Sequence, residues 1–296
     1  PVHPALRKSF RFYNSFFYYS SLSARQAVRG GFMSSLTLSN ITASYGKAPV
    51  VTGVSAAFAA GRLTVLAGPN GCGKSTLLRA IMGFLPDIRG DVSLDGQPVA
   101  KIGRRMLARR IAYLAQESSC PDYMTLGELV ELGGYARYSL MGGPSNRDRQ
   151  LFREALETVG LADKAHLPVN TLSGGQRQRA WIAMVLAQDT DIVLMDEPVN
   201  HLDVKYQYAV LGLVRALVRN HGKTVIMVLH DLNLAAAFAD DIILMKAGRI
   251  LASGPVPSTI TSENVARVFD LEAEVFPRED RLVFLPRLPS SETASP

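Results

Sequence analysis

The segment that most constrains the fold of this chain runs from Gly68 to Thr76 and reads GPNGCGKST. Residues 63–67 before it are almost all apolar and predict a short buried strand. Residues 77–82 after it carry apolar side chains in a helical pattern. A strand, a glycine-rich loop and a helix in this order match the pattern Gly-x-x-x-x-Gly-Lys-Ser/Thr, which begins a helix at the end of a strand in an α/β protein.

The chemistry of this loop suits a bound phosphate. Glycines let consecutive backbone N–H groups turn inward around an anion without clashes from a Cβ atom, and the following helix adds the positive end of its dipole. Lys74 would neutralise the β- and γ-phosphates of a nucleotide, and Ser75 would give Mg²⁺ a hydroxyl ligand. An ordinary glycine turn would not explain the flanking strand and helix. The predicted ATP-binding residues are Gly68, Pro69, Asn70, Gly71, Cys72, Gly73, Lys74, Ser75 and Thr76.

A second strand-like segment, residues 191–195, ends in two adjacent acids, Asp196 and Glu197. An apolar strand that delivers an acid at its carboxyl end is typical of the magnesium site of nucleotide hydrolases. Asp196 would hold Mg²⁺ through water, and Glu197 would polarise the attacking water. Adjacent acids at a strand end are also found as solvated turn residues, but the phosphate loop favours the catalytic interpretation.

The charge of the chain is concentrated at its start. The net charge is +6, and residues 1–32 hold five Lys and Arg residues and no Asp or Glu. The rest of the chain therefore keeps 27 of the 32 basic residues against all 26 acidic ones. Because this part is nearly neutral, we expect no general attraction to polyanions and no nucleic acid among the partners.

Residues 1–32 are basic, aromatic and rich in serine. Met33 directly precedes the first strand-like pattern, so we expect residues 1–32 to be a non-native start or a disordered extension. The alternatives are an organelle presequence and an anchor at a membrane surface.

The chain holds two cysteines, Cys72 and Cys120. A disulfide at Cys72 would obstruct the phosphate loop, so we expect two unpaired thiols in a reducing compartment. No apolar run approaches the roughly 18–20 residues that span a bilayer. If the protein serves a membrane, we expect it to dock onto a partner.

A further motif occupies residues 172–179 and reads LSGGQRQR. It has the form of a second phosphate site, with a hydroxyl, exposed backbone N–H groups and a helix expected over residues 176–188. With this motif the sequence resembles the ABC-transporter ATPase family, over about residues 36–283. In that family the motif faces the γ-phosphate held by the other subunit, so two copies close around two ATP molecules with C₂ symmetry. The residues implied are Ser173, Gly174, Gly175 and Gln176.

Other site residues are implied by the resemblance, one position at a time. Tyr45 matches the aromatic residue that stacks on adenine. Gln116 matches the glutamine that contacts magnesium and the attacking water, and His230 matches the histidine that contacts the γ-phosphate and positions Glu197. Asp203 matches the aspartate that couples the two sites across the dimer.

The resemblance also implies the architecture. We expect an α/β fold of the ABC ATPase type, with a P-loop NTPase core of mostly parallel sheet and an antiparallel β subdomain. An inserted α-helical subdomain is expected at about residues 117–172, where helical patterns alternate with loop signals such as GGPSN at 142–146. A single domain would cover residues 33–286, followed by a disordered tail at 287–296.

Residues 178–188, 108–116 and 124–130 resemble the iron-siderophore, haem and cobalamin importer branch, and most closely the ferric-siderophore ATPases. Residues 133–136 depart from the Gly-Arg-Tyr-Pro pattern of that branch, in the segment where the permease docks. The implied partners are a second copy, two transmembrane permease subunits and, indirectly, a periplasmic solute-binding protein. The implied location is the cytoplasmic face of the inner membrane, with ATP and Mg²⁺ as cofactors.

Two other classes use the same kind of cassette. A soluble translation factor would carry two cassettes in one chain, and a repair ATPase would carry a long coiled coil between the two halves of its cassette. The chain has one phosphate loop and a short insert. A non-hydrolysing module is disfavoured because Lys74, Gln116, Glu197 and His230 are all present.

Overall fold

The computed structural model describes residues 35–46, 48–138, 142–200, 202–279 and 281–287. The expectations for residues 1–32 and for residues 288–296 lie outside these ranges. Arg287 at the end of the described chain donates from its backbone N–H to the carbonyl of Glu272 and from its guanidinium to Glu274.

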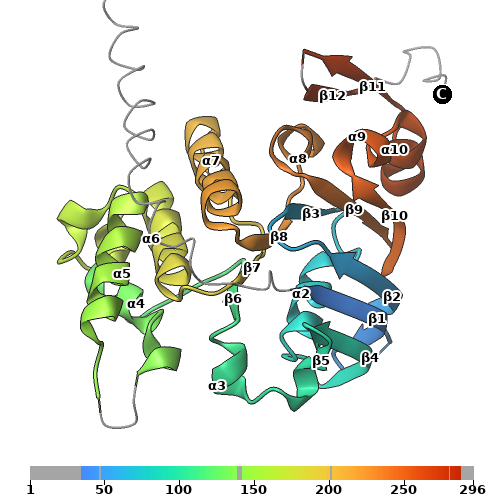
Figure 1. Cartoon of the computed structure of the whole chain (residues 1–296). Helices are drawn as coiled ribbons and strands as arrows, with labels where there is room; N and C mark the ends of the chain where they lie inside the picture. The colour runs from blue at the N-terminus through green and yellow to red at the C-terminus, as the bar shows by residue number, and fades with distance from the viewer. Residues whose placement is uncertain (1–34, 47, 139–141, 201, 280, 288–296) are drawn as a thin grey trace, which may run out of the picture. The chain divides into compact units, whose positions relative to one another are not determined.

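A central sheet runs in the order β10-β9-β3-β8-β7-β6 (Figure 1). Its parallel strands are β3 (Leu63–Ala67), β6 (Ile111–Leu114), β7 (Ile192–Met195), β8 (Thr224–Val228) and β9 (Asp241–Lys246), and β10 (Arg249–Pro255) pairs antiparallel to β9. Each residue of β3, β7 and β8 is buried. Such continuous apolar strands are expected where both faces of a parallel sheet are covered.

Alternate residues of these strands face two separate hydrophobic clusters. Leu194 and Ile226 pack in the cluster that contains the leucines of α2 (Lys74–Ile81). Val193 and Met195 pack in the other cluster, with residues of α6 (Gly174–Ala187) and α7 (Val204–His221). The period of two along a strand therefore decides which side chains face α2.

A second sheet is antiparallel and runs in the order β2-β1-β4-β5. Its strands are β1 (Leu36–Ser44), β2 (Val51–Phe58), β4 (Asp87–Leu94) and β5 (Gln97–Pro98). Apolar residues of β1 and β2 pack in the same cluster as α2. This sheet and the parallel sheet confirm the predicted α/β core with an antiparallel β subdomain.

Helices α4 (Leu126–Leu132) and α5 (Asn146–Thr158) lie between β6 and α6 in the chain and pack against α6 (Figure 1). Thr125 and Ser145 begin these helices with capping boxes, in which the cap hydroxyl accepts from the N3 amide and the N3 acid accepts from the cap amide. They confirm the predicted helical insertion. Short 3₁₀ turns accompany them at Tyr135–Arg137, Ala162–Lys164 and Val169–Thr171.

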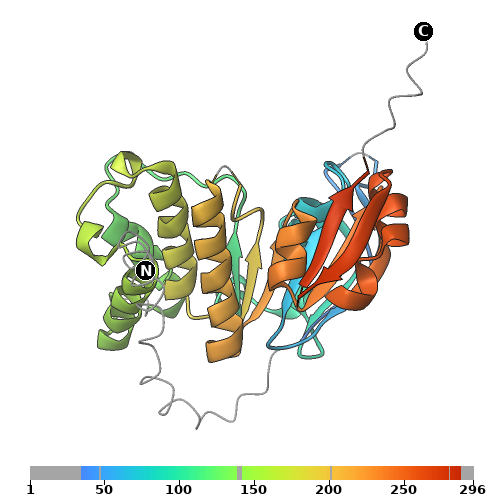
Figure 2. The ribbon, with the colours of Figure 1, turned by 90° about the horizontal axis from the view of Figure 1, so that it is seen from above.

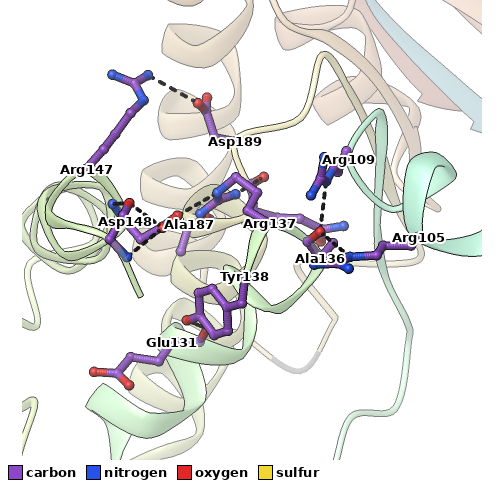
Figure 3. A network of polar contacts seen from close by, with 12 residues as sticks. Arg105, Arg109, Glu131, Ala136, Arg137, Tyr138, Arg147, Asp148, Ala187 and Asp189 are labelled. Carbon is purple, nitrogen blue, oxygen red and sulfur yellow. Dashed lines mark hydrogen bonds and ion pairs between the residues drawn. The ribbon is translucent and has the colours of Figure 1, made fainter. Parts of the chain in front are cut away.

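A polar network fixes this helical part to its neighbours (Figure 3). The Arg137 guanidinium donates to the Asp148 carboxylate at 2.7 Å and to the carbonyls of Gln188 and Ala187 at 2.5 and 2.8 Å. The two carbonyls lie at the C-terminal end of α6, where a cation also meets the negative end of the helix dipole. Two more arginines, Arg105 and Arg109, donate to the Ala136 carbonyl at 3.0 and 2.8 Å. Arg105 lies in the helix α3 (Arg104–Leu107) and Arg109 follows it, so the segment 136–137 is tied both to α3 and to α6.

The last described part holds α8 (Leu232–Phe238), α9 (Val256–Thr259), α10 (Ser262–Phe269) and the hairpin of β11 (Ala273–Arg278) and β12 (Arg281–Pro286). Strand β12 packs against α8, as Figure 2 shows. Thr261 caps α10: its hydroxyl accepts from the Asn264 amide at 3.1 Å. The apolar residues 282–285 are typical of a strand and form the centre of β12, whereas no such run marks β11. Within the described residues, no helix has both the length and the apolar character needed to cross a membrane.

Candidate active site

The loop from Gly68 to Thr76 connects β3 to α2, as predicted. Glycine is required at Gly68, where φ is +154° and an added Cβ would lie 2.1 Å from the Met245 carbonyl oxygen. At Gly73, φ is +105° and a Cβ would lie 3.0 Å from the Val51 side chain. Only glycine tolerates this backbone and this close approach, so the glycines of the motif set the shape of the loop.

Lys74 is 5% exposed. Its ammonium donates to the carbonyls of Gly68 at 2.8 Å and Pro69 at 3.0 Å. A buried cation needs such partners, because burial without them is costly. The loop therefore closes around its own lysine. When a phosphate binds, its oxygens would replace the two carbonyls as acceptors of the Lys74 ammonium.

Asp196 follows β7 directly and is fully buried. Its Oδ1 accepts from the Ser75 hydroxyl at 2.8 Å. Burial raises the pKa of Asp196, and the neighbouring Glu197 charge raises it further, while the hydrogen bond from Ser75 lowers it. A carboxylate and a hydroxyl brought together in this way are hard oxygen ligands, the kind that Mg²⁺ prefers. The residues therefore fit the magnesium ion that the loop chemistry implies.

Glu197 lies at the centre of a group of polar side chains. Its Oε1 lies 2.6 Å from His230 Nε2, and its Oε2 accepts from Gln116 Nε2 at 2.6 Å and from the Asn200 amide. The backbone of Glu197 has φ +52°, a left-handed conformation that costs a non-glycine residue about 1 kcal/mol or more. Strained backbone of this kind is concentrated at functional sites. Here it occurs at Glu197, two residues after the end of β7.

Most of the predicted residues line one cleft of about 850 Å³. Its lining joins the phosphate loop to the three predicted catalytic residues and to three positions that the sequence did not predict. The lining residues are Val50, Gly68, Pro69, Asn70, Gly71, Gly73, Lys74, Ser75, Thr76, Gln116, Glu197, Asn200, His230 and Phe269. Asn200 and Phe269 were missed because neither belongs to a motif with its own chemistry.

Several predicted residues lie elsewhere. Cys72 is buried behind the loop at 4% exposure, and burial raises the pKa of its thiol. Tyr45 is 49% exposed and its hydroxyl accepts from Arg79 at 3.2 Å. Among the described residues, neither Tyr45 nor any signature residue lines the cleft.

The signature motif forms the N-terminus of α6, which begins at Gly174, two residues before the predicted start. Ser173 caps the helix: its hydroxyl accepts from the Gln176 amide at 3.4 Å, and the Gln176 side chain accepts from the Ser173 amide at 3.0 Å. Ser173 and Gly174 are exposed, as is Asp203, which caps α7 without a side-chain hydrogen bond. An exposed helix N-terminus with a hydroxyl that still has its hydrogen to donate can receive an anion from a second molecule.

The fold and this cleft define a nucleotide-binding P-loop protein. The family model described as ABC transporter matches residues 51–200, which include the phosphate loop and the acids after β7. The chain therefore belongs to the ABC transporter family, as the sequence motifs suggested, and it is an ABC-type ATPase.

Curated relatives cover most of the chain. The iron(3+)-hydroxamate import ATP-binding protein FhuC of Bacillus subtilis is 37% identical over 86% of this chain and 95% of its own length. The ferric enterobactin transport ATP-binding protein FepC of Escherichia coli is 40% identical over 79% and 87%. The hemin import ATP-binding protein HmuV of Bordetella pertussis is 38% identical over 80% and 92%.

Solved structures agree with this membership. An ABC transporter of the metal-chelate type in an inward-facing conformation matches with a TM-score of 0.74 and 26% identity, over 86% of this chain and 98% of that chain. A dimeric ABC transporter cassette matches with a TM-score of 0.67 and 30% identity, over 75% and 98%.

Proposed function

We propose that this chain is the ATP-hydrolysing subunit of an importer that takes up a ferric siderophore across the inner membrane. The observation that carries the catalytic part is the single cleft that joins the phosphate loop to Glu197, Gln116 and His230. The cargo class is supported by relatives named for import of iron(3+)-hydroxamate and ferric enterobactin.

The cleft accounts for hydrolysis through the chain's own side chains. When ATP binds, the Lys74 ammonium gives up its hydrogen bonds to the Gly68 and Pro69 carbonyls and donates to β- and γ-phosphate oxygens instead. Glu197 accepts the proton of the attacking water, and His230 holds its carboxylate in place at 2.6 Å. Ser75, Gln116 and, through water, Asp196 would hold the magnesium ion, which would supply positive charge to the transferring phosphate.

The complete site requires a second copy. The residues of the cleft surround the phosphate loop, but the exposed N-terminus of α6 with Ser173 and Gly174 lies outside the cleft. A partner related by C₂ symmetry brings that helix to the γ-phosphate, and each chain then supplies half of each site. The dimeric cassette that matches this chain supports the arrangement. Tyr45 stacks on adenine, and Asp203 couples the two sites.

The helical part is the place where a permease docks. Tyr135 is 73% exposed and Leu132 is 48% exposed, and Met106 on α3 is 54% exposed. Tyr135 is followed by Ala136 and Arg137, which the arginine network fixes to α3 and α6 (Figure 3). Large exposed apolar side chains on a fixed segment suit a protein partner. The chain then sits at the cytoplasmic face of the membrane on two permease subunits, and a periplasmic solute-binding protein delivers the cargo to them.

Haem is the second candidate cargo, favoured by the relative named for hemin import, and cobalamin is the third. The subunit that hydrolyses ATP does not touch the cargo, so the residues of this chain do not discriminate among them. A soluble translation or repair ATPase is not favoured, because the relatives named above are import and transport proteins.

The cargo is tested by deleting the gene and measuring uptake of radioactive iron supplied as a hydroxamate siderophore, enterobactin, petrobactin or achromobactin, and uptake of haem and cobalamin. We expect uptake of at least one ferric siderophore to fall to background, because import stops without hydrolysis. The wild-type gene should restore it, and the Glu197→Gln gene should not. Loss of haem or cobalamin uptake with every siderophore unaffected would assign the second or third cargo. No change in any uptake would refute the importer function.

A further inference from the structure

Two polar side chains of α2 lie one helical turn apart and face the same neighbours. Ser75 and Arg79 are separated by four residues, the spacing that places side chains on one face of a helix. Ser75 reaches Asp196 directly, at 2.8 Å. Arg79 is not part of the phosphate-loop motif, and the mechanism above gives it no role.

The facing strands present two polar residues to this side of α2. Tyr113 is in β6, where its neighbours Ala112 and Leu114 face the opposite cluster. Tyr113 itself packs in the cluster that contains α2. Asp196 continues the alternation of β7, one residue after Met195. The pleat of the sheet therefore brings the phenol and the carboxylate to the same face.

Hydrogen bonds join Asp196 to both Ser75 and Tyr113, and Arg79 lies near them. The Tyr113 hydroxyl lies 3.4 Å from Asp196 Oδ2. The other carboxylate oxygen, Oδ1, accepts from Ser75. Both oxygens of a fully buried carboxylate are thus fixed, one by the Ser75 hydroxyl of α2 and one by the Tyr113 phenol of β6. Burial raises the pKa of the Tyr113 phenol, and the nearby Arg79 guanidinium counteracts part of that rise. The Arg79 charge lowers the pKa of Asp196, against the larger rise that burial causes.

Arg79 has a second branch that leads away from the aspartate. Its guanidinium donates to the Tyr45 hydroxyl at 3.2 Å. Tyr45 is half-exposed after β1, so a hydrogen bond to its hydroxyl restricts the ring. A guanidinium can serve two acceptors at once because its donors form a rigid fork. The Arg79 side chain therefore holds the aromatic ring at one end of the site and places its charge near the buried carboxylate at the other.

We propose that Arg79 and Tyr113 are positioning residues: Tyr113 aims the Asp196 carboxylate at the magnesium ion, and Arg79 fixes both Tyr113 and the Tyr45 ring that stacks on the base. The proposal rests on the nucleotide site proposed above. Groups that orient a metal ligand from behind typically change metal affinity by 10–100-fold when they are lost. Arg79 therefore links recognition of the base to the geometry of the metal site.

Binding of a fluorescent ATP analogue, measured with Mg²⁺ and again with EDTA, separates the two branches. Tyr113→Phe removes only the hydroxyl, so the gain in affinity that Mg²⁺ brings should fall about 10-fold while metal-free affinity stays unchanged. Arg79→Gln should reduce that gain similarly and should also weaken metal-free binding about fivefold, because Tyr45 loses a hydrogen bond. The matched control is Arg104→Gln, because Arg104 donates to the Met82 and Gly83 carbonyls near the same helix end and should change neither constant.

The melting temperature of each variant and its affinity for the ATP analogue in EDTA distinguish a positioning role from a structural one. An unchanged magnesium gain in Tyr113→Phe would overturn the proposal. So would a parallel loss of both affinities with a lower melting temperature, since that pattern is structural. If wild-type protein bound no ATP analogue at all, the proposed nucleotide site itself would be wrong, which is a separate outcome.

Discussion

Glu197→Gln should reduce ATP hydrolysis about 1000-fold while ATP still binds, because general-base catalysis contributes about that much and an amide cannot accept the proton of water. The substitution keeps the shape of the side chain, and its carbonyl oxygen can still accept from Gln116 or Asn200. The loss should therefore appear in kcat, with the fold intact. Phosphate release by purified protein and binding of a fluorescent ATP analogue measure the two effects.

The control for this variant is Glu157→Gln, which changes an exposed glutamate on α5 by the same chemistry. It should hydrolyse ATP like wild type. Hydrolysis by Glu197→Gln within about tenfold of wild type would contradict the assignment of Glu197, because such a residual rate exceeds what a lost general base allows.

Lys74→Ala should raise the Kd for ATP about 100-fold. Charge-assisted hydrogen bonds contribute about 1.5–3 kcal/mol each, so the loss of a pair to phosphate oxygens amounts to at least about 3 kcal/mol. The loop also loses the ammonium that holds the Gly68 and Pro69 carbonyls. Titration of the protein with a fluorescent ATP analogue, with and without Mg²⁺, measures the change.

Two further variants sharpen this experiment. Lys74→Arg keeps the charge, but its larger planar head does not fit a loop that closes on a single nitrogen at 2.8 and 3.0 Å, so binding should also weaken. Lys101→Ala removes an exposed lysine and should bind ATP normally. ATP binding by Lys74→Ala within a few-fold of wild type would show that the loop does not hold the phosphates in the way described.

The parts of the fold that could be predicted from the sequence are those with a strong local pattern. The strand at 63–67, the loop and α2 follow from an apolar run, glycines and a helical pattern, and the structure places them as expected. The strand β11 was missed because Pro277 and its charged neighbours are unfavourable in a strand. It forms because β12 pairs with it along its whole length.

The residues of the site divide in the same way: those that belong to motifs could be predicted, and those outside motifs could not. Glu197, Gln116 and His230 come from distant segments, yet each belongs to a motif, and the structure brings them together. Asn200 reaches the same carboxylate, but a lone amide in a loop gives no sequence signal. Tyr113 reads as one more apolar strand position, and only the pleat of β6 beside β7 shows that it faces Asp196. Long-range side-chain contacts of this kind depend on register, which the motifs do not specify.

The central claim is that two copies of this chain share two ATP molecules. Light scattering on Glu197→Gln protein tests it most directly, because that variant should hold ATP without hydrolysing it. We expect the molar mass to double on addition of Mg-ATP and to stay monomeric without nucleotide. The double variant with Ser173→Arg should remain monomeric, because a bulky cation at the cap of α6 blocks the approach of the partner's phosphates. A mass that stays monomeric at saturating Mg-ATP, or that doubles despite Ser173→Arg, would contradict the shared site.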